Sequence, residues 1–163
     1  MKRAAAVALL AAFPTVSACD PSYALDGNPI PPGKCRPGAG ASEFVATSFY
    51  RRALIEKQVR SAFEGFVDPA FIEHKPDIAG GDREGAIRFL EGLMAELPQA
   101  RWELLRVVAD RDLVAIHARF TPAPGAPDYA IADFFRIADC RIVEHWDVVS
   151  PPPREAPNSQ SRF

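Results

Sequence analysis

Three short stretches of the sequence hold residues that could carry out chemistry. Asp133 lies within an apolar stretch beside Ile131, Phe135 and Ile137, where a carboxylate is unfavourable unless it is paired or functional. An apolar environment favours the protonated form of a carboxyl group, which would suit Asp133 for proton exchange near neutral pH. Two interpretations stay open. Asp133 is an acid/base group, or it is structural, paired with a nearby arginine such as Arg136 or facing solvent.

The second and third candidates contain histidine. Glu144-His145-Trp146-Asp147 interrupts a segment otherwise rich in Ile and Val, and alternation along a strand places His145 with Asp147 and Glu144 with Trp146. The alternative is a polar or dimer-forming sheet face. His74 precedes Lys75-Pro76, and a lone histidine before a loop is more often structural or solvated.

Other types of site lack their sequence signatures. The three histidines do not show the HxH or HxxxH spacing of a metal site, and no two cysteines are spaced as zinc ligands. There is no GxSxG elbow, glycine-rich phosphate loop or CxxC motif. We therefore expect no metal and no cofactor. The 19 basic and 21 acidic residues give a net charge of −2 with no basic stripe, so nucleic acid is not an expected partner.

The elements that would position these candidates follow from the hydrophobic periodicity. Helical spacing predicts a helix over 42–67 that bends or divides beyond Glu56, and a second helix over 83–97 with Asp82 as its cap and Pro98 as its stop. A period of two then predicts strands over 101–109, 113–121, 129–137 and 141–149. Helices followed by an antiparallel meander indicate an α+β domain, with the helices on one sheet face.

The last hairpin allows a prediction of side-chain faces. If Asp139-Cys140 forms a two-residue loop, Asp133 lies opposite Trp146 and shares a face with Glu144. His145 and Asp147 would then lie on the other face. A slip of one residue, or one bulge, exchanges the two sets.

The sequence before and after this domain indicates export. Residues 1–18 have a basic start and a short apolar run, which is typical of a secretory signal peptide. Val16-Ser17-Ala18-Cys19 resembles the lipobox of bacterial lipoproteins, which implies lipidation of Cys19, a cell-envelope location and membrane contact only through this anchor. Simple cleavage before Cys19 is the alternative, and an unacylated Cys19 could bridge to Cys35. The Pro/Gly-rich residues 19–41 read as a linker, 42–150 as the domain and 151–163 as a disordered tail.

Three motifs together resemble one known family. Ile72-Glu73-His74-Lys75-Pro76, Ala132-Asp133-Phe134-Phe135-Arg136-Ile137 and Arg141-Ile142-Val143-Glu144-His145-Trp146-Asp147-Val148 are similar to the SnoaL-like polyketide cyclases of the nuclear-transport-factor-two-like superfamily. The sequence departs from the family pattern at Cys140, where glycine is usual, at Arg141, where lysine is usual, and at Lys75, where asparagine is common.

The resemblance implies a cone in which N-terminal helices close a curved antiparallel sheet around an apolar pocket. It also implies cofactor-free chemistry on a small apolar carbonyl compound, such as an aldol-type cyclisation, an isomerisation or a lyase reaction. Asp133 would be the acid/base, and His74, or His145 if it faces inward, would hydrogen-bond the carbonyl oxygen. Tyr50 and Trp146 would shape the pocket. The same resemblance leaves open an alternative function, a lipid-anchored binding module without catalysis. We also expect a homodimer that forms through the exposed sheet face.

Overall fold

The computed structural model describes residue 29 and residues 35–163. The elements, in chain order, are α1 (Ala39–Tyr50), a π-helical turn η2 (Arg51–Ile55), α2 (Val59–Phe66), β1 (Val67–Glu73), α3 (Arg83–Glu96), β2 (Arg101–Asp110), β3 (Leu113–Thr121), β4 (Tyr129–Ala138) and β5 (Arg141–Ser150). The predicted signal peptide and Cys19 lie outside the described residues. Within the described part of the chain, no helix has both the length and the apolar character needed to span a membrane.

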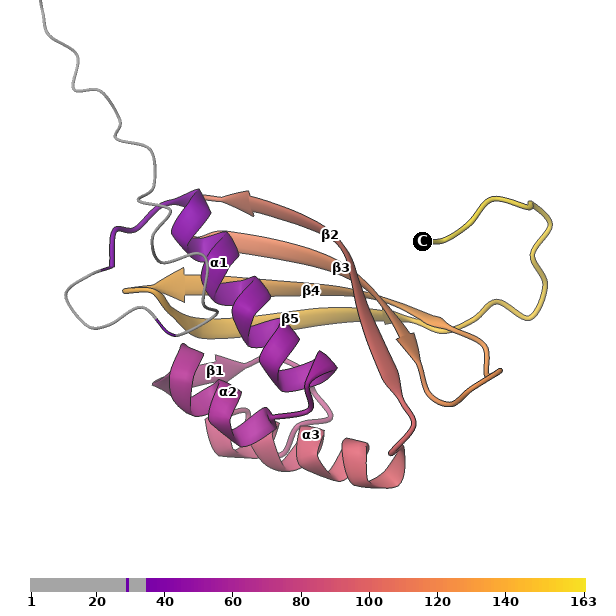
Figure 1. Ribbon diagram of the computed structural model, residues 1–163, viewed down its shortest axis with the longest axis horizontal. Coiled ribbons are helices and arrows are strands. Elements are labelled where there is room, and N and C mark those ends of the chain that lie inside the picture. The colour runs from indigo at the N-terminus through magenta and orange to yellow at the C-terminus, as the bar shows by residue number, and fades with distance from the viewer. Residues whose placement is uncertain (1–28, 30–34) are drawn as a thin grey trace, which may run out of the picture.

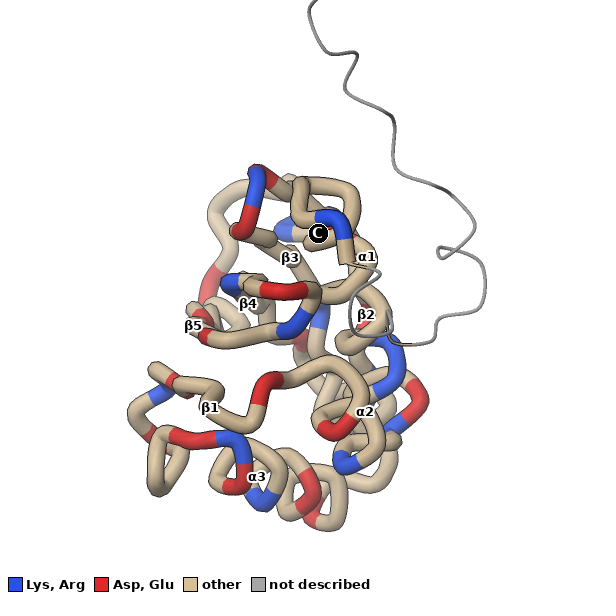
Figure 2. The backbone as a smooth tube through the Cα atoms, turned by 90° about the vertical axis from the view of Figure 1, so that its left-hand side faces the viewer, with Lys and Arg blue, Asp and Glu red and all other residues tan. Residues whose placement is uncertain are grey.

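A curved five-stranded sheet carries the fold. Its strand order is β1-β5-β4-β3-β2, with β2 to β5 forming the predicted antiparallel meander. Figure 1 shows α1 running across this sheet, with α2 and α3 gathered near β1. The α+β class and the helix-covered face are thus confirmed. The colouring in Figure 2 shows basic and acidic residues interspersed along the elements.

The sheet is mixed rather than wholly antiparallel, because β1 joins its edge parallel to β5. The strand β1 was not predicted, because Asp68-Pro69 is typical of a helix break and gives no strand signal. Proline has no N–H to donate, but an edge strand tolerates it. The pairing with β5 shifts register between Val67 and Ile72 and then places Glu73 beside His145.

Local signals predict most helix ends, but α1 begins at Ala39 with Gly38 as its N-cap, within the predicted linker and three residues before the predicted start at 42. The long N-terminal helical segment divides at η2, as the break in its apolar stripe indicates, and both halves bury apolar residues. Asp82 caps α3, because its Oδ1 accepts a hydrogen bond of 2.7 Å from the Gly85 N–H. Phe49 of α1 joins the layers, since its ring packs against Phe63 of α2 at 5.0 Å and against Phe135 of β4 at 5.9 Å.

The β4–β5 hairpin departs from its predicted register after two pairs. Asp139 and Cys140 form the two-residue loop, both with positive φ, as a tight hairpin turn requires. Ile137 pairs with Ile142, but Arg136 then pairs with Glu144, so Val143 is the extra residue of a β-bulge. The predicted pairing of Asp133 with Trp146 is therefore wrong.

Beyond the bulge, the faces are exchanged. Asp133 lies opposite Asp147, so His145 and Asp147 share the inner face with Asp133. Glu144, Trp146 and Val148 alternate with them and face outward.

Two connections outside the sheet complete the fold. A disulfide joins Cys35 to Cys140 in the hairpin loop, with 5.7 Å between their Cα atoms, so Cys35 does not pair with Cys19. Residues 151–163 contain no helix or strand, yet the end of this predicted disordered tail contacts the outer sheet face. There the Phe163 ring lies 4.4 Å from the Arg119 guanidinium, and Arg162 donates a 2.8 Å hydrogen bond to the Ser150 carbonyl.

Candidate active site

The helices and the inner sheet face enclose a cavity of about 370 Å³, which is within the size range of small-molecule sites. Its walls come from every helix and from all five strands. Most of the lining is apolar, and nine aromatic side chains contribute to it: Phe49, Tyr50, Phe63, Phe71, Phe89, Trp102, Phe120, Tyr129 and Phe135. The polar lining residues gather where β1, β4 and β5 meet.

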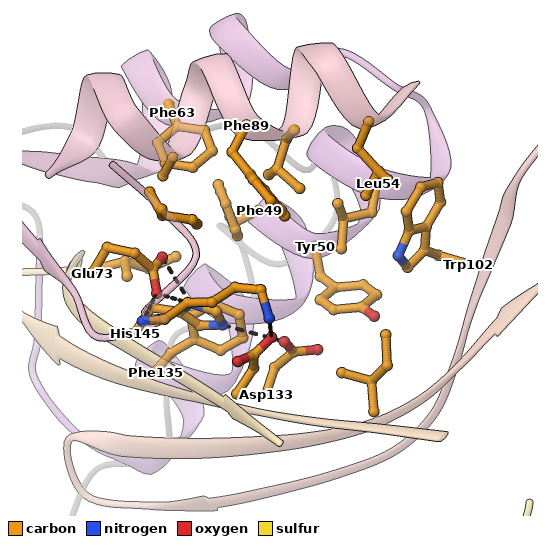
Figure 3. Close-up of a pocket in the computed structure, with 18 of the residues that line it drawn as sticks. Phe49, Tyr50, Leu54, Phe63, Glu73, Phe89, Trp102, Asp133, Phe135 and His145 are labelled. Carbon is orange, nitrogen blue, oxygen red and sulfur yellow. Dashed lines mark hydrogen bonds and ion pairs between the residues drawn. The ribbon is translucent and has the colours of Figure 1, made fainter. Parts of the chain in front are cut away.

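A histidine between two carboxylates forms the centre of this polar cluster. His145 Nδ1 lies 2.9 Å from Glu73 Oε2, and His145 Nε2 lies 3.2 Å from Asp133 Oδ1 (Figure 3). The side chains of Glu73 and Asp133 are 3% and 10% exposed. Three strands therefore place three ionisable groups in one buried row.

The row fixes the protonation state of His145. Each ring nitrogen faces a carboxylate oxygen, and both can donate only when the imidazole is protonated. Burial by itself would lower the pKa of His145, but the hydrogen bonds and charges of Asp133 and Glu73 outweigh it and raise that pKa to about 10. At neutral pH the residue is an imidazolium, and its ring also stacks on Phe135 at 4.9 Å.

Tyr50 adds a phenol to the same wall. It is the last residue of α1 and is fully buried, and burial together with the neighbouring Asp133 carboxylate raises its pKa, so the hydroxyl stays protonated. Neither Tyr50 Oη nor Asp133 Oδ2 has a hydrogen-bond partner among the residues that the structure describes. The two groups are close enough to interact with each other, and a ligand oxygen that bridges them would satisfy both buried atoms.

A second polar pair adjoins this cluster, because Asp147 is the cross-strand neighbour of Asp133. Lys75 Nζ is 2.8 Å from Asp147 Oδ2, and Asp77 lies further off, at 3.8 Å from the same nitrogen. The Lys75 backbone N–H also donates a 2.9 Å hydrogen bond to Glu73 Oε1. This short loop after β1 therefore holds the Glu73 carboxylate in place for His145.

The structure brings together only some of the residues selected from the sequence. Asp133, His145 and Tyr50 line one cavity, and His145 faces inward because of the bulge. Asp133 does not pair with Arg136, whose guanidinium contacts Glu144 at 2.9 Å and Asp112 at 3.1 Å.

His74 and Trp146 lie elsewhere, on the outer face of the sheet. Their rings stack at 4.5 Å and 5°, and His74 Nε2 is 3.0 Å from Glu144 Oε2. Neither residue lines the cavity. This placement does not support the expected hydrogen bond from His74 to a substrate carbonyl, nor the expected contribution of Trp146 to the pocket wall.

Sequence reasoning did not select Glu73, Lys75 or Asp147 as site residues. A prediction of the strand β1 would have identified Glu73, because alternation along this strand turns Phe71 and Glu73 inward together. Asp147 shares its face with His145, so the correct register identifies both. Among the described residues, no group of three or more His, Cys, Asp or Glu side chains is arranged to hold a metal ion.

Comparison with known proteins gives one family match. The family model described as the SnoaL-like domain matches residues 46–145, which contain every cavity residue of the polar cluster except Asp147. No curated protein matches the chain.

Several solved structures share the fold at low identity. IdmH, a candidate polyketide cyclase from Streptomyces antibioticus, is 22% identical over 66% of this chain and 91% of its own, with a TM-score of 0.57. A candidate polyketide cyclase from Bacillus cereus ATCC 10987 is 19% identical over 77% of this chain and 89% of its own, with a TM-score of 0.60. A candidate polyketide cyclase from Acidithiobacillus ferrooxidans is 19% identical over 67% of this chain and 87% of its own, with a TM-score of 0.57.

Proposed function

The chain belongs to the SnoaL-like domain family, and from this premise we propose that it is an acid/base enzyme acting on a small apolar carbonyl compound. The observation that carries the proposal is the buried row Glu73–His145–Asp133, which ends beside the Tyr50 hydroxyl in an apolar cavity. Proton transfer at a carbon next to a carbonyl needs a base and a donor for the developing oxyanion. Asp133 and Tyr50 supply these two groups.

In the proposed reaction, Asp133 Oδ2 removes the proton while His145 holds Oδ1. The Tyr50 hydroxyl donates to the carbonyl oxygen as it gains enolate charge. In an aldol-type closure the enolate carbon then attacks a second carbonyl of the same molecule, and Asp133 returns its proton to the new alkoxide. In an isomerisation the proton returns to another carbon. Glu73 orients the imidazolium throughout.

Deuterium exchange tests the first step without the natural substrate. Wild type should accelerate exchange at the carbon next to the carbonyl of 1-tetralone in D₂O, followed by NMR. Asp133→Asn keeps the shape of the side chain but is not a base, so the rate should fall by roughly 10²–10⁴-fold. Asp112→Asn, on an exposed residue outside the cavity lining, is the matched control and should leave the rate unchanged.

A binding module of the same fold is the second candidate function. It is favoured by the unpartnered atoms Tyr50 Oη and Asp133 Oδ2, which would orient a ligand whether or not chemistry follows. Two results would favour this function over the enzyme. One is saturable binding of 1-tetralone without faster deuterium exchange. The other is an exchange rate of Asp133→Asn within about twofold of wild type, because acid/base groups contribute more than that.

We also propose that the protein works in the cell envelope, anchored through a lipid on Cys19. The basic and apolar leader and the lipobox-like Val16-Ser17-Ala18-Cys19 support this location. The Cys35–Cys140 disulfide supports it independently, because disulfides persist mainly in oxidising compartments.

A further inference from the structure

We propose that the Lys75–Asp147 ion pair sets the charge specificity of the cavity, so that uncharged ligands bind and carboxylates are rejected. The inference rests on the proposed function, because it names the class of substrate that the same site accepts.

The charges of the cavity lining do not cancel. Three largely buried carboxylates line the cavity, those of Glu73, Asp133 and Asp147, against the two cations Lys75 and His145. Asp77 also lines it, but its side chain is 68% exposed. Even with His145 protonated, negative charge is in excess. Charges interact strongly where apolar walls exclude water, so this excess disfavours an anionic ligand.

Both cations of the lining already have partners. His145 directs one ring nitrogen to Glu73 and the other to Asp133. Lys75 Nζ lies 2.8 Å from Asp147 Oδ2, and these two side chains are only 17% and 13% exposed. Within the cavity lining, which belongs wholly to the described part of the chain, a ligand carboxylate would find no uncommitted cation.

Tyr50 Oη and Asp133 Oδ2 also favour an uncharged ligand. A hydroxyl or enol oxygen can accept a hydrogen bond from Tyr50 Oη and donate one to Asp133 Oδ2. A carboxylate can accept from Tyr50, but it has no proton for Asp133 and brings a like charge against it. The aromatic walls offer ring contacts to either kind of ligand, so charge alone distinguishes them.

Two probes built on the same naphthalene ring, one with a hydroxyl and one with a carboxylate, test this selectivity. Calorimetric titration of the full chain at pH 7 should give a dissociation constant for 2-naphthol at least about tenfold below that for 2-naphthoate. Asp147→Asn removes one carboxylate and releases Lys75, so the affinity for naphthoate should rise about tenfold or more while that for naphthol changes less than about threefold.

The opposite substitution gives the opposite result. Lys75→Gln leaves Asp147 without its cation and should weaken naphthoate binding further. Asp112→Asn makes the same chemical change as Asp147→Asn at an exposed residue outside the lining, and it should change neither affinity. A pair with a merely structural role would instead shift both probes together in both variants, and that result would overturn the inference.

The experiment separates this inference from the proposed function, because it measures binding and not turnover. Equal affinity of wild type for both probes, or tighter binding of naphthoate, would overturn the charge specificity and leave the acid/base proposal standing. Selective binding of naphthol together with a failed exchange assay would overturn only the enzyme. No binding of either probe would overturn the charge specificity, and the exchange assay would still decide the enzyme proposal.

Discussion

Glu73→Gln is the substitution that best tests the electrostatics of the buried row. Glutamine keeps the size of the side chain and can still accept a hydrogen bond from His145, but it removes one of the two charges that face the imidazolium. We expect the pKa of His145 to fall from about 10 toward its ordinary value of 6.5. The remaining interaction with Asp133 should keep it from falling the whole way.

The magnitude follows from linkage between protonation and folding. The folded-state pKa of His145 is raised above its unfolded value, so the stabilisation is fully present below pH 6.5 and is lost as the pH rises to about 10. At about 1.36 kcal/mol per pH unit, this interval corresponds to an upper limit on the order of 5 kcal/mol. Between pH 7 and pH 10 the unfolding free energy of wild type should therefore fall by up to about 1.4 kcal/mol per pH unit from this group.

Two measurements check this expectation. Denaturant titrations between pH 6 and pH 10 give the unfolding free energy, and NMR of the His145 ring gives its titration directly. In Glu73→Gln the decrease of the unfolding free energy with rising pH should end at a lower pH than in wild type. Glu144→Gln is the matched control, because Glu144 contacts His74 on the outer face instead, and it should leave the His145 titration unchanged. A wild-type His145 ring that titrates at or below pH 7 would refute the reasoning.

Three further predictions concern the rest of the chain. Cys140→Ser should lower the unfolding free energy by about 2–4 kcal/mol in urea titrations, because the disulfide closes a separation of 105 residues; equal midpoints for oxidised and reduced wild type would contradict this. Light scattering at micromolar concentration should give the mass of a homodimer formed through the outer sheet face, where Phe134 and Val148 are exposed, and a monomer mass would exclude it. Cys19→Ser should move the protein from the membrane fraction to the soluble fraction. A wild-type protein found in the soluble fraction would contradict lipidation of Cys19.

The parts of the fold that the sequence predicts are those with local causes. Asp82 and Pro98 delimit α3 because a cap and a stop act on the residues beside them. The four strands of the meander appear within one residue of their predicted bounds, because alternation with short turns is also a local pattern.

The remaining features depend on contacts distant in the sequence or on a single residue. The strand β1 forms by pairing with β5, and Glu73 meets a histidine 72 positions away. The bulge at Val143 interrupts the alternation of β5, so that Ile142 before it and His145 after it both line the cavity. No residue type in the sequence signals this bulge, yet it decides that His145 rather than Glu144 shares a face with Asp133. The identity of Asp133 and His145 as candidates was thus available from the sequence, while their meeting was not.

The Cys35–Cys140 bond also has a consequence for the order of events during maturation. Cys35 precedes α1, and Cys140 lies in the loop of the last hairpin. Cys35 therefore emerges from the ribosome more than a hundred residues before Cys140. The fold holds the two sulfurs together once the last hairpin lies beside the helices, whereas in the unfolded chain the separation of 105 residues makes their encounters less frequent. We therefore expect the Cys35–Cys140 disulfide to form late and to stabilise a nearly complete fold. Until then the Cys35 thiol stays free or bonds to another thiol.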